Sequence, residues 1–517
     1  MKEPATKPSP VTSSWPDQLA AIDIGSNSFR LEIAQLKDGR YRRIDYLKET
    51  VRLGAGLDSE GLLTQDAGAR GLACLQRFAQ RLEGFQSQQI RAVATQTLRE
   101  ARNRDAFLRQ AETVLGHPVE VISGREEARL IYAGVAMLQA SELPRLVIDI
   151  GGRSTEIILG RGRQPIRAES FQVGSVSLSM AYFADGRFTE QAFRAAQVAA
   201  GAELEEALQP FASRHWREAL GSSGTVGAVS QLLSASGITD GSITPDGLRW
   251  LIEQCLRAGR VDRLSLPGLK EDRRAVIAGG LSILYTLSTH FGIETLQPAR
   301  GALRQGVIFD LAARLDAAGG QFSGEPGHDI RDESVAELQR RFHVDVTHAN
   351  RVASVAAALY DDIRDSIEPA DPLQDPRRDL LWACALHEMG MMVSHHDHHR
   401  HSAYLLAHVD AAGFSQSQQR RLADLLLGQR GGLRKIEPRL TSPDFAWQTL
   451  CLRLAIIKCH ARGEIDPHAI NLRGLGDRAV LGFVPGWVDS HPRTLFLLQQ
   501  EQAAWGRNGP LKLSIAD

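Results

Sequence analysis

The sequence predicts an α/β protein with two similar halves in its N-terminal region, followed by a helical domain and a small C-terminal α+β cap. Three observations predict this fold class. The segment AIDIGSNSFR at residues 21–30 returns in similar form as VIDIGGRSTE at residues 147–156, a strand leads into a helix at residues 118–133, and helical periodicity runs through residues 328–465. Since 517 residues exceed what one hydrophobic core organises, we expect three or four domains of about 100–200 residues.

The composition is that of a globular protein and argues against some classes of partner. Hydrophobic residues make up 43% of the chain and charged residues 23%, and the formal net charge is −1. No global positive field indicates binding to nucleic acid or to a membrane surface, so a polyanionic ligand must bind local basic patches. Five scattered cysteines are typical of reduced thiols, and no run of eighteen apolar residues is present. We expect a cytoplasmic protein without a transmembrane segment, with peripheral membrane association as the alternative location.

The repeated segments predict two β-hairpins with tight turns of small residues. Their alignment pairs Asp23 with Asp149, Gly25 with Gly151 and Ser28 with Ser154. Because no bulky side chain is in the way, backbone N–H groups and hydroxyls of such turns can approach an anion closely. A carboxylate repels a phosphate unless a cation or a water lies between them, so Asp149 and Asp23 predict Mg²⁺ or a bridging water. The alternative is two ordinary hairpins whose aspartates hold the turns, but two copies in matching register favour the phosphate site.

Two further segments fit the same kind of site. GSSGTVGA at residues 221–228 is a turn of glycine and hydroxyl residues that leads into a helix. In VEVISGREEARLIYAG at residues 118–133, Ser123 and Glu126 predict a capping box at the start of a helix. Glu127 has no such structural role, and its side chain leaves the helix about 100° from that of Glu126. It can therefore point toward the site, although an acidic residue in the first turn also stabilises the helix dipole.

Two phosphate-binding hairpins in successive α/β halves resemble the superfamily of acetate and sugar kinases, heat-shock protein 70 and actin, whose site lies between the halves. Six motifs, in their order and spacing, resemble more specifically the exopolyphosphatase and guanosine pentaphosphate phosphohydrolase family: DIGSNSFRL, TQTLREA, ISGREEARLIY, DIGGRSTE, VGSVSL and GSSGT. Residues from about 18 to 315 carry this resemblance. The later segment ALHEMGMMVSHHDHHRHSAYLL resembles the helical domain of the long bacterial exopolyphosphatases.

The resemblance implies roles for individual residues. It implies that Glu127 activates water and that Asp149 and Glu156 serve magnesium and phosphate, so the predicted catalytic residues are Glu127 and Glu156 and the predicted metal ligands are Asp23, Asp149 and Glu156. The predicted substrate-binding residues are Gly25, Ser26, Asn27, Ser28, Arg99, Gly151, Gly152, Arg153, Ser154, Thr155, Gly224 and Thr225. Where the family usually has a third glycine, this chain has Arg153, which we expect to add a phosphate contact. The alternative is that Arg153 crowds the turn.

The resemblance and the composition together divide the chain. We expect a tail at residues 1–17, phosphatase subdomains at 18–138 and 139–315, a Gly-rich linker at 316–327, a helical HD-like domain at 328–465 and a small C-terminal domain at 466–517. Seven histidines lie between His387 and His408, a density that suggests metal ligation. The metal-dependent HD phosphohydrolases pair histidine with aspartate, however, whereas Glu388 follows His387 here. Solvated or hydrogen-bonded histidines are therefore the expected state.

We expect direct hydrolysis of a phosphoanhydride, because no histidine or cysteine in these turns could act as a nucleophile. The predicted function is Mg²⁺-dependent, processive exopolyphosphatase, with K⁺ as a candidate monovalent ion, no nucleic-acid partner and a homodimer as the expected assembly. The alternatives are a guanosine pentaphosphate 5′-phosphohydrolase and a non-catalytic polyphosphate-binding regulator. Basic clusters such as Arg340 with Arg341 would suit a long polyanion, although such clusters are also common on solvated surfaces.

Overall fold

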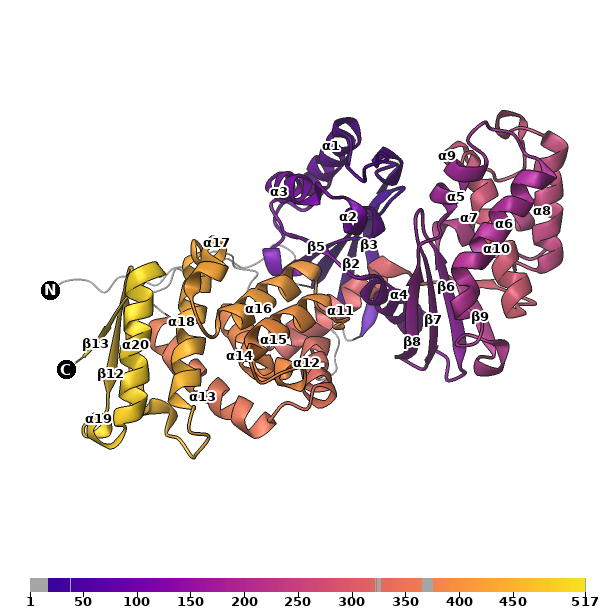
Figure 1. The fold of residues 1–517 in the computed structure, drawn as a ribbon. Helices are drawn as coiled ribbons and strands as arrows, with labels where there is room; N and C mark the ends of the chain where they lie inside the picture. Colours follow the sequence, from indigo (N-terminus) through magenta and orange to yellow (C-terminus); the bar gives the residue numbers. More distant parts are fainter. Residues whose placement is uncertain (1–16, 38, 321, 323–326, 365–374, 517) are drawn as a thin grey trace. The chain divides into compact units, whose positions relative to one another are not determined.

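The computed structural model describes residues 17–37, 39–320, 322, 327–364 and 375–516. These residues form two compact units, of which the first ends at Asp329 and the second begins at Ile330 (Figure 1). The predicted tail at residues 1–17 lies, apart from Asp17, outside the described residues, and so does part of the predicted linker. The finer domain boundaries drawn from the sequence remain predictions.

Two mixed five-stranded sheets organise the first unit. The first has the order β3 (Arg40–Glu49), β2 (Phe29–Lys37), β1 (Gln18–Ile24), β4 (Ile90–Ala94), β5 (Val119–Val121). The second has the order β8 (Gln164–Phe171), β7 (Thr155–Arg161), β6 (Arg145–Ile150), β9 (Glu218–Gly221), β10 (Gln297–Pro298). In each sheet the central strand pairs antiparallel with the strand that follows it and parallel with a later strand. The two predicted hairpins and their duplication are therefore confirmed.

Successive residues of β1 face two different hydrophobic cores, as the alternation of side chains along a strand requires. The helices of the first half are α1 (Gln65–Arg81), α2 (Gln96–Glu100), α3 (Arg104–Leu115) and α4 (Gly124–Leu138). Ile22 and Ile24 belong to the core that includes α1 and α3. Leu19 and Ala21 belong to the core that includes α4. Because both faces of the sheet are covered, the central strand is a nearly continuous apolar run.

The second half adds helices before the chain returns to the first sheet. They are α5 (Ser175–Tyr182), α6 (Glu190–Leu204), α7 (Gly224–Ala235), α8 (Pro245–Ala258), α9 (Glu271–Arg274), α10 (Ile277–Phe291) and α11 (Leu303–Ala317). Helix α11 packs on α4 so closely that a Cβ at Gly306 would lie 1.7 Å from the carbonyl oxygen of Leu130. Their shared core also contains Val93 of the first sheet and Val147 of the second. These two helices therefore fix the halves against each other, which positions the turns described below.

The second unit combines helices with a small sheet. Its longer helices are α12 (Ile330–Arg341), α13 (Val346–Ile363), α14 (Pro376–Leu386), α15 (His398–His408), α16 (Gln416–Gly428), α18 (Pro443–Lys458) and α20 (Pro492–Asn508). Strand β12 (Arg478–Phe483) pairs antiparallel with β11 (Ile470–Leu475) and parallel with β13 (Lys512–Ile515). Helical residues such as Leu359 and strand residues such as Leu481 belong to one hydrophobic core. The helical part and the sheet of this unit are thus packed as a single body.

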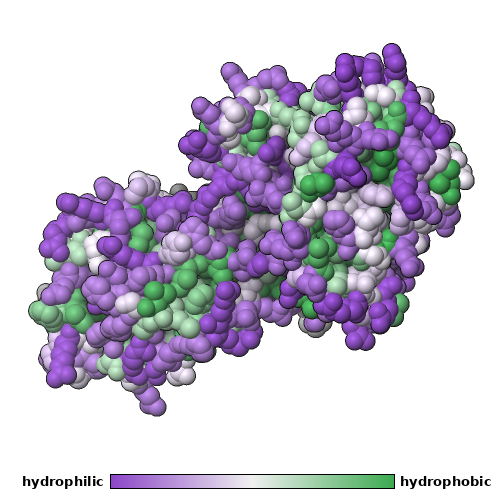
Figure 2. All heavy atoms as spheres, turned by 45° about the vertical axis from the view of Figure 1, so that its right-hand side comes forward, coloured by the Kyte–Doolittle hydropathy of each residue, from purple (hydrophilic) through white to green (hydrophobic). Residues whose placement is uncertain are grey.

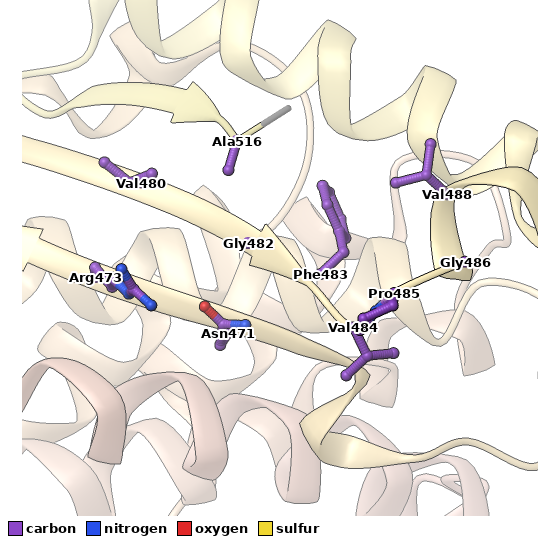
Figure 3. Close-up of a pocket in the computed structure, with 10 residues that line it drawn as sticks. All are labelled: Asn471, Arg473, Val480, Gly482, Phe483, Val484, Pro485, Gly486, Val488 and Ala516. Carbon is purple, nitrogen blue, oxygen red and sulfur yellow. The ribbon is translucent and has the colours of Figure 1, made fainter.

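The surface is mainly hydrophilic on the face shown in Figure 2, with small hydrophobic patches. None of the helices built by the described residues combines the length and the apolar character needed to cross a bilayer. A pocket of about 420 Å³ lies on the small sheet of the second unit (Figure 3). Its lining includes Asn471, Arg473 and Phe483 and none of the residues predicted to form the phosphate site. The chemistry predicted from the sequence therefore concerns a different place, in the first unit.

Candidate active site

The two hairpins place four charged side chains at equivalent positions of their strand pairs. Asp23 of β1 lies opposite Arg30 of β2, and Asp149 of β6 lies opposite Glu156 of β7. Each pair directly precedes the last strand pairing before the turn. The duplication therefore places an acid and a base beside the first turn, and two acids beside the second.

Glu127 joins these hairpins from the first turn of α4. One half of the predicted capping box is confirmed, because the Ser123 hydroxyl accepts a hydrogen bond from the N–H of Glu126. The Glu126 carboxylate forms two hydrogen bonds with Arg129, which fixes it in the protein interior. Glu127 lies beside it on the helix, with 7% of its surface exposed. As predicted, Glu126 has a structural role, and Glu127 is the acidic residue of this turn that approaches the hairpin aspartates.

Burial raises the pKa of all four carboxyl groups, Asp23, Glu127, Asp149 and Glu156, and neighbouring carboxylates add to the rise at Glu127, Asp149 and Glu156. Burial raises the pKa of Glu127 to about 7, against the opposing effect of Arg99, and the charges of Asp23 and Asp149 add to the rise. Burial and then the charges of Glu127 and Asp149 raise the pKa of Glu156 well above its usual range. The pKa values of Asp23 and Asp149 are raised as well, mainly by burial. Such raised values are typical of groups that hold a cation or exchange protons.

Arg99 holds Glu127 in place. Its Nη1 donates to Glu127 Oε2 over 2.7 Å and to the carbonyl oxygen of Ile122 over 3.1 Å. Its Nε and Nη2 donate to Gln96 Oε1 over 2.9 and 2.6 Å. The guanidinium is thus bound on several sides and presents its charge to the carboxylate, while the predicted contact with phosphate remains a prediction.

The carboxylates on the second hairpin fit a divalent cation. Glu156 is 1% exposed, and its Oε2 is buried without a hydrogen-bond partner. Its Oε1 accepts a hydrogen bond from Ser170 Oγ over 2.7 Å, and Asp149 Oδ2 accepts one from Ser222 Oγ over 2.6 Å. An unpartnered carboxylate oxygen beside a second carboxylate is costly without a positive charge, and oxygen ligands are those that Mg²⁺ prefers. The residues that could hold this ion are therefore Asp149 and Glu156.

Asp23 differs from these two residues because arginines neutralise it. Arg30 Nη1 lies 3.6 Å and Arg304 Nη1 3.7 Å from Asp23 Oδ2. Arg304 also pairs with the buried Glu32 over 3.1 Å. A metal ion at Asp23 would have to approach these two cations. The structure thus offers less support for Asp23 as a metal ligand than for Asp149, and its assignment stays a prediction.

Three arginines form a cationic group that the sequence interpretation missed: Arg30, Arg273 and Arg304. A Cβ added to Gly224, at the start of α7, would lie 2.4 Å from Arg273 Nη2 and 3.0 Å from Arg30 Nη2. Two guanidinium groups therefore meet beside the third predicted loop. Burial, and then the charge of Arg30, lower the pKa of Arg273. Like charges held together in this way are typical of a site for an anion.

The predicted turns lie against one another across the two halves. A Cβ at Gly152 would lie 3.1 Å from Ser26 Cβ and 3.5 Å from the backbone nitrogen of Asn27. Ser26 Oγ accepts a hydrogen bond from Thr97 Oγ1 over 2.8 Å, whereas Ser28 Oγ is buried without a partner. The first and second turns are therefore brought together as one surface of small residues.

The remaining predicted residues of the turns serve largely to shape them. Thr155 Oγ1 donates to the carbonyl oxygen of Val173, and Thr225 Oγ1 donates to that of Ile150 over 3.0 Å. Gly25 and Gly151 each lie close to the backbone oxygen of the serine three residues later, Ser28 and Ser154. These contacts shape the turns, and binding of substrate by the residues themselves remains a prediction.

Arg153 makes contacts that the sequence alone could not predict. Its Nε donates to Glu100 Oε2 over 2.9 Å and its Nη1 donates to the carbonyl oxygen of Gly54 over 3.2 Å. Both partners belong to the first half, so Arg153 links the second turn to that half. The expected phosphate contact would compete with this ion pair and stays a prediction.

Two sequence models of one protein family match the chain. The model described as the Ppx/GppA phosphatase family matches residues 32–315. The model described as domain III of the Ppx/GppA phosphatases matches residues 330–502. The two matches fall on either side of the boundary between the two compact units.

Solved structures of related proteins resemble a little more than half of the chain. An exopolyphosphatase from Cytophaga hutchinsonii is 22% identical, with a TM-score of 0.52, over 57% of this chain and 97% of its own. An exopolyphosphatase-like protein is 24% identical, with a TM-score of 0.52, over 58% of this chain and 98% of its own. The PPX-GPPA enzyme of Aquifex aeolicus is 27% identical, with a TM-score of 0.48, over 56% of this chain and 98% of its own. The first two share its fold over the matched part.

The family match and the observed fold agree with the resemblance that the six sequence motifs indicate. The first family model covers both sheets from β2 onward, together with Glu127, Asp149 and Glu156. This chain belongs to the Ppx/GppA phosphatase family and is a hydrolase.

Proposed function

We propose that this chain is an exopolyphosphatase that removes the terminal phosphate of inorganic polyphosphate processively, by direct attack of water, with Mg²⁺. The observation that carries the proposal is the buried Glu127 carboxylate, whose pKa is raised to about 7 among acidic neighbours. A general base is most effective when its pKa lies near the working pH. Family membership supports a phosphatase reaction, and the proposal adds the substrate and the roles of the residues.

Glu127 acts as the general base in this proposal. The oxygen of water attacks the terminal phosphorus while a Glu127 oxygen accepts the proton. The bond between this phosphorus and the bridging oxygen breaks, and the shortened chain leaves with the electron pair. A positioned base of this kind contributes a rate factor of about 10²–10⁴. Arg99 keeps the carboxylate oriented through its hydrogen bond to Oε2.

The cationic group and the turns bind the phosphates. Negative charge spreads over the phosphoryl oxygens in the transition state of phosphoryl transfer. Arg30 and Arg273 lie beside Gly224 at the amino end of α7, where the helix dipole is positive. Fixed positive charges aimed at this place stabilise the developing charge. In this proposal the terminal phosphates bind between the cationic group and Glu127.

Asp149 and Glu156 are the residues that we propose for holding Mg²⁺. When bound, the ion supplies positive charge that neutralises phosphate oxygens. Ser222 and Ser170 orient the two carboxylates through the hydrogen bonds described above. No observation on the described residues bears on the expected K⁺ or homodimer, and both stay predictions.

Side-by-side assays of the purified enzyme test the substrate. We expect Mg²⁺-dependent release of orthophosphate from long polyphosphate, with a higher kcat/KM than for guanosine pentaphosphate. A clear preference for guanosine pentaphosphate would replace the proposal by the 5′-phosphohydrolase function. Binding of polyphosphate without release of orthophosphate from either substrate would favour the non-catalytic regulator instead.

A further inference from the structure

A second cluster of side chains that can bind a metal ion lies in the second unit, whereas the residues of the candidate active site belong to the first. His348 lies in the first turn of α13, His387 directly follows α14, and Glu388 is its neighbour. One ligand atom from each residue lies within 4.8 Å of the others, and all three side chains are buried. The Nε2 atoms of both histidines lie 3.9 Å from Glu388 Oε1. Two imidazoles therefore converge on one carboxylate oxygen inside the protein.

The surrounding residues hold His387 in the form that a metal ligand requires. Its Nδ1 lies 2.7 Å from the carbonyl oxygen of Cys384, which can only accept a hydrogen bond. This contact assigns the proton to Nδ1 and leaves the lone pair on Nε2, the nitrogen that lies 3.9 Å from Glu388 Oε1. The carbonyl oxygen of His387 itself accepts hydrogen bonds from Ser402 Oγ and Gln429 Nε2, each over 3.0 Å. The ring is thus fixed through both its side chain and its backbone.

The backbone of His348 is held at the start of α13. The side chain of Asp345 caps α13 and accepts a hydrogen bond from the N–H of His348 over 2.9 Å. The ring is 4% exposed, and its Nδ1 is buried without a hydrogen-bond partner. A buried ring nitrogen without a partner is costly, and a metal ion bound at Nε2 would not supply that partner. The ring nitrogen that faces the cluster is Nε2, 3.9 Å from Glu388 Oε1.

Arg462 occupies the outer side of the cluster. Its guanidinium pairs with Glu388 and, over 3.2 Å, with Asp345. The side chain is 43% exposed, and the residue has a φ of 57°, a conformation that costs energy for a residue with a side chain. The charge of Glu388 is thus balanced by a cation that can turn out into solvent.

We propose that His348, His387 and Glu388 bind a divalent transition metal ion of the Zn²⁺ class, which displaces Arg462 from Glu388. Two imidazoles and one carboxylate are a ligand set suited to such ions, with a water in the fourth position. Ligands of a tetrahedral Zn²⁺ lie about 3.4 Å apart when each bond is about 2.1 Å. The two observed separations are 3.9 Å, and all ligand atoms lie within 4.8 Å of one another, so metal binding requires the three side chains to approach one another. The proposal is independent of the function proposed for the first unit.

The test measures binding of Zn²⁺ to the full-length protein in the absence of polyphosphate. The protein is first stripped with a chelator and dialysed, and Zn²⁺ is then titrated in competition with a chromophoric chelator. We expect one equivalent whose affinity falls by at least about tenfold in His387→Gln and His348→Gln. The matched control His396→Gln changes a fully solvated histidine of the same segment and should keep this equivalent. Asp149→Asn should keep it too, which separates this site from the phosphatase residues.

Arg462→Ala distinguishes a metal site from a purely structural ion pair. The proposal requires Zn²⁺ affinity to rise in this variant, by about threefold or more, because the competing cation is gone. Glu388→Gln keeps the shape of the side chain and should weaken binding even if a histidine variant fails to fold. Unchanged Zn²⁺ affinity in folded Glu388→Gln, or no gain in Arg462→Ala, would overturn the proposal.

Discussion

Arg99 Nη1 donates a hydrogen bond to Glu127 Oε2 over 2.7 Å, so the side chain proposed to activate water is tied to a partly buried cation. The positive charge favours the ionised carboxylate, whereas burial favours the protonated one and prevails, giving a pKa of about 7. These two opposing effects determine the pH above which the Glu127 carboxylate is mainly deprotonated.

The activity should therefore depend on pH through Glu127. A general base works only when it is deprotonated. The value of kcat/KM should therefore rise as the pH increases through about 7, and it should be low at pH values where Glu127 is protonated. Arg99→Gln removes the charge that lowers the pKa, and the acid limb of the profile should shift to higher pH. Arg102→Gln, which changes an exposed arginine nearby, should leave the limb in place. A pH profile of Arg99→Gln in which the maximal kcat/KM falls but the acid limb does not move would contradict this account of the Arg99–Glu127 pair.

The response to Mg²⁺ should depend on the second hairpin. Asp149→Asn and Glu156→Gln each remove one negative charge from the proposed metal ligands, so half-maximal activity should require at least about tenfold more Mg²⁺. Glu190→Gln, at the exposed start of α6, serves as the control. Identical magnesium titrations in all three variants and the wild type would return Asp149 and Glu156 to a structural role.

The arginines beside α7 can be tested without mutating them. Gly224→Ala places a methyl group 2.4 Å from Arg273 Nη2, so the guanidinium must move, and KM for polyphosphate should rise by about fivefold, equivalent to about 1 kcal/mol. Gly227→Ala, in the same helix, meets no atom within 4 Å. Both changes replace a glycine of α7 by a better helix former, and only the first displaces an arginine, so only the first should affect binding. Equal KM values for the two variants would argue against a phosphate contact at this place.

The second unit should matter for long substrates. Only a few phosphates can contact the first unit at once, so a long chain gains affinity from further weak contacts, which raise the local concentration of its next end. A protein truncated after about residue 320 should hydrolyse short substrates but lose affinity, processivity and salt sensitivity on long polyphosphate. Complete degradation of long chains without intermediates by a folded truncated protein would instead favour a role in assembly or regulation.

The local parts of the site could be predicted from the sequence, and its long-range parts could not. Asp23 and Asp149 were found because a duplicated hairpin repeats its residues at a fixed spacing, and both hairpins formed in the same register. The repeat also indicates Arg30, because this residue occupies in the first hairpin the position that Glu156 occupies in the second. Arg273 belongs to no motif, and only the packing of the second half brings it to Gly224.

Arg153 illustrates a different limit. Its place in a predicted phosphate turn suggested a contact with substrate, but its partners Glu100 and Gly54 lie far away in the sequence. Nothing in the local pattern indicates such partners. The two duplicated hairpins of the first unit, in contrast, followed from hydrophobic patterns and the repeat, because each hairpin is built by segments that follow one another in the chain.

The most direct test of the central claim is Glu127→Gln, measured for both turnover and binding of polyphosphate. The amide keeps the size and polarity of the side chain but cannot accept the proton of water. We expect turnover to fall by at least about 10²-fold while the dissociation constant for polyphosphate stays within about threefold of the wild-type value. Turnover within about tenfold of wild type would show that Glu127 is not the base, and the proposed mechanism would then be wrong.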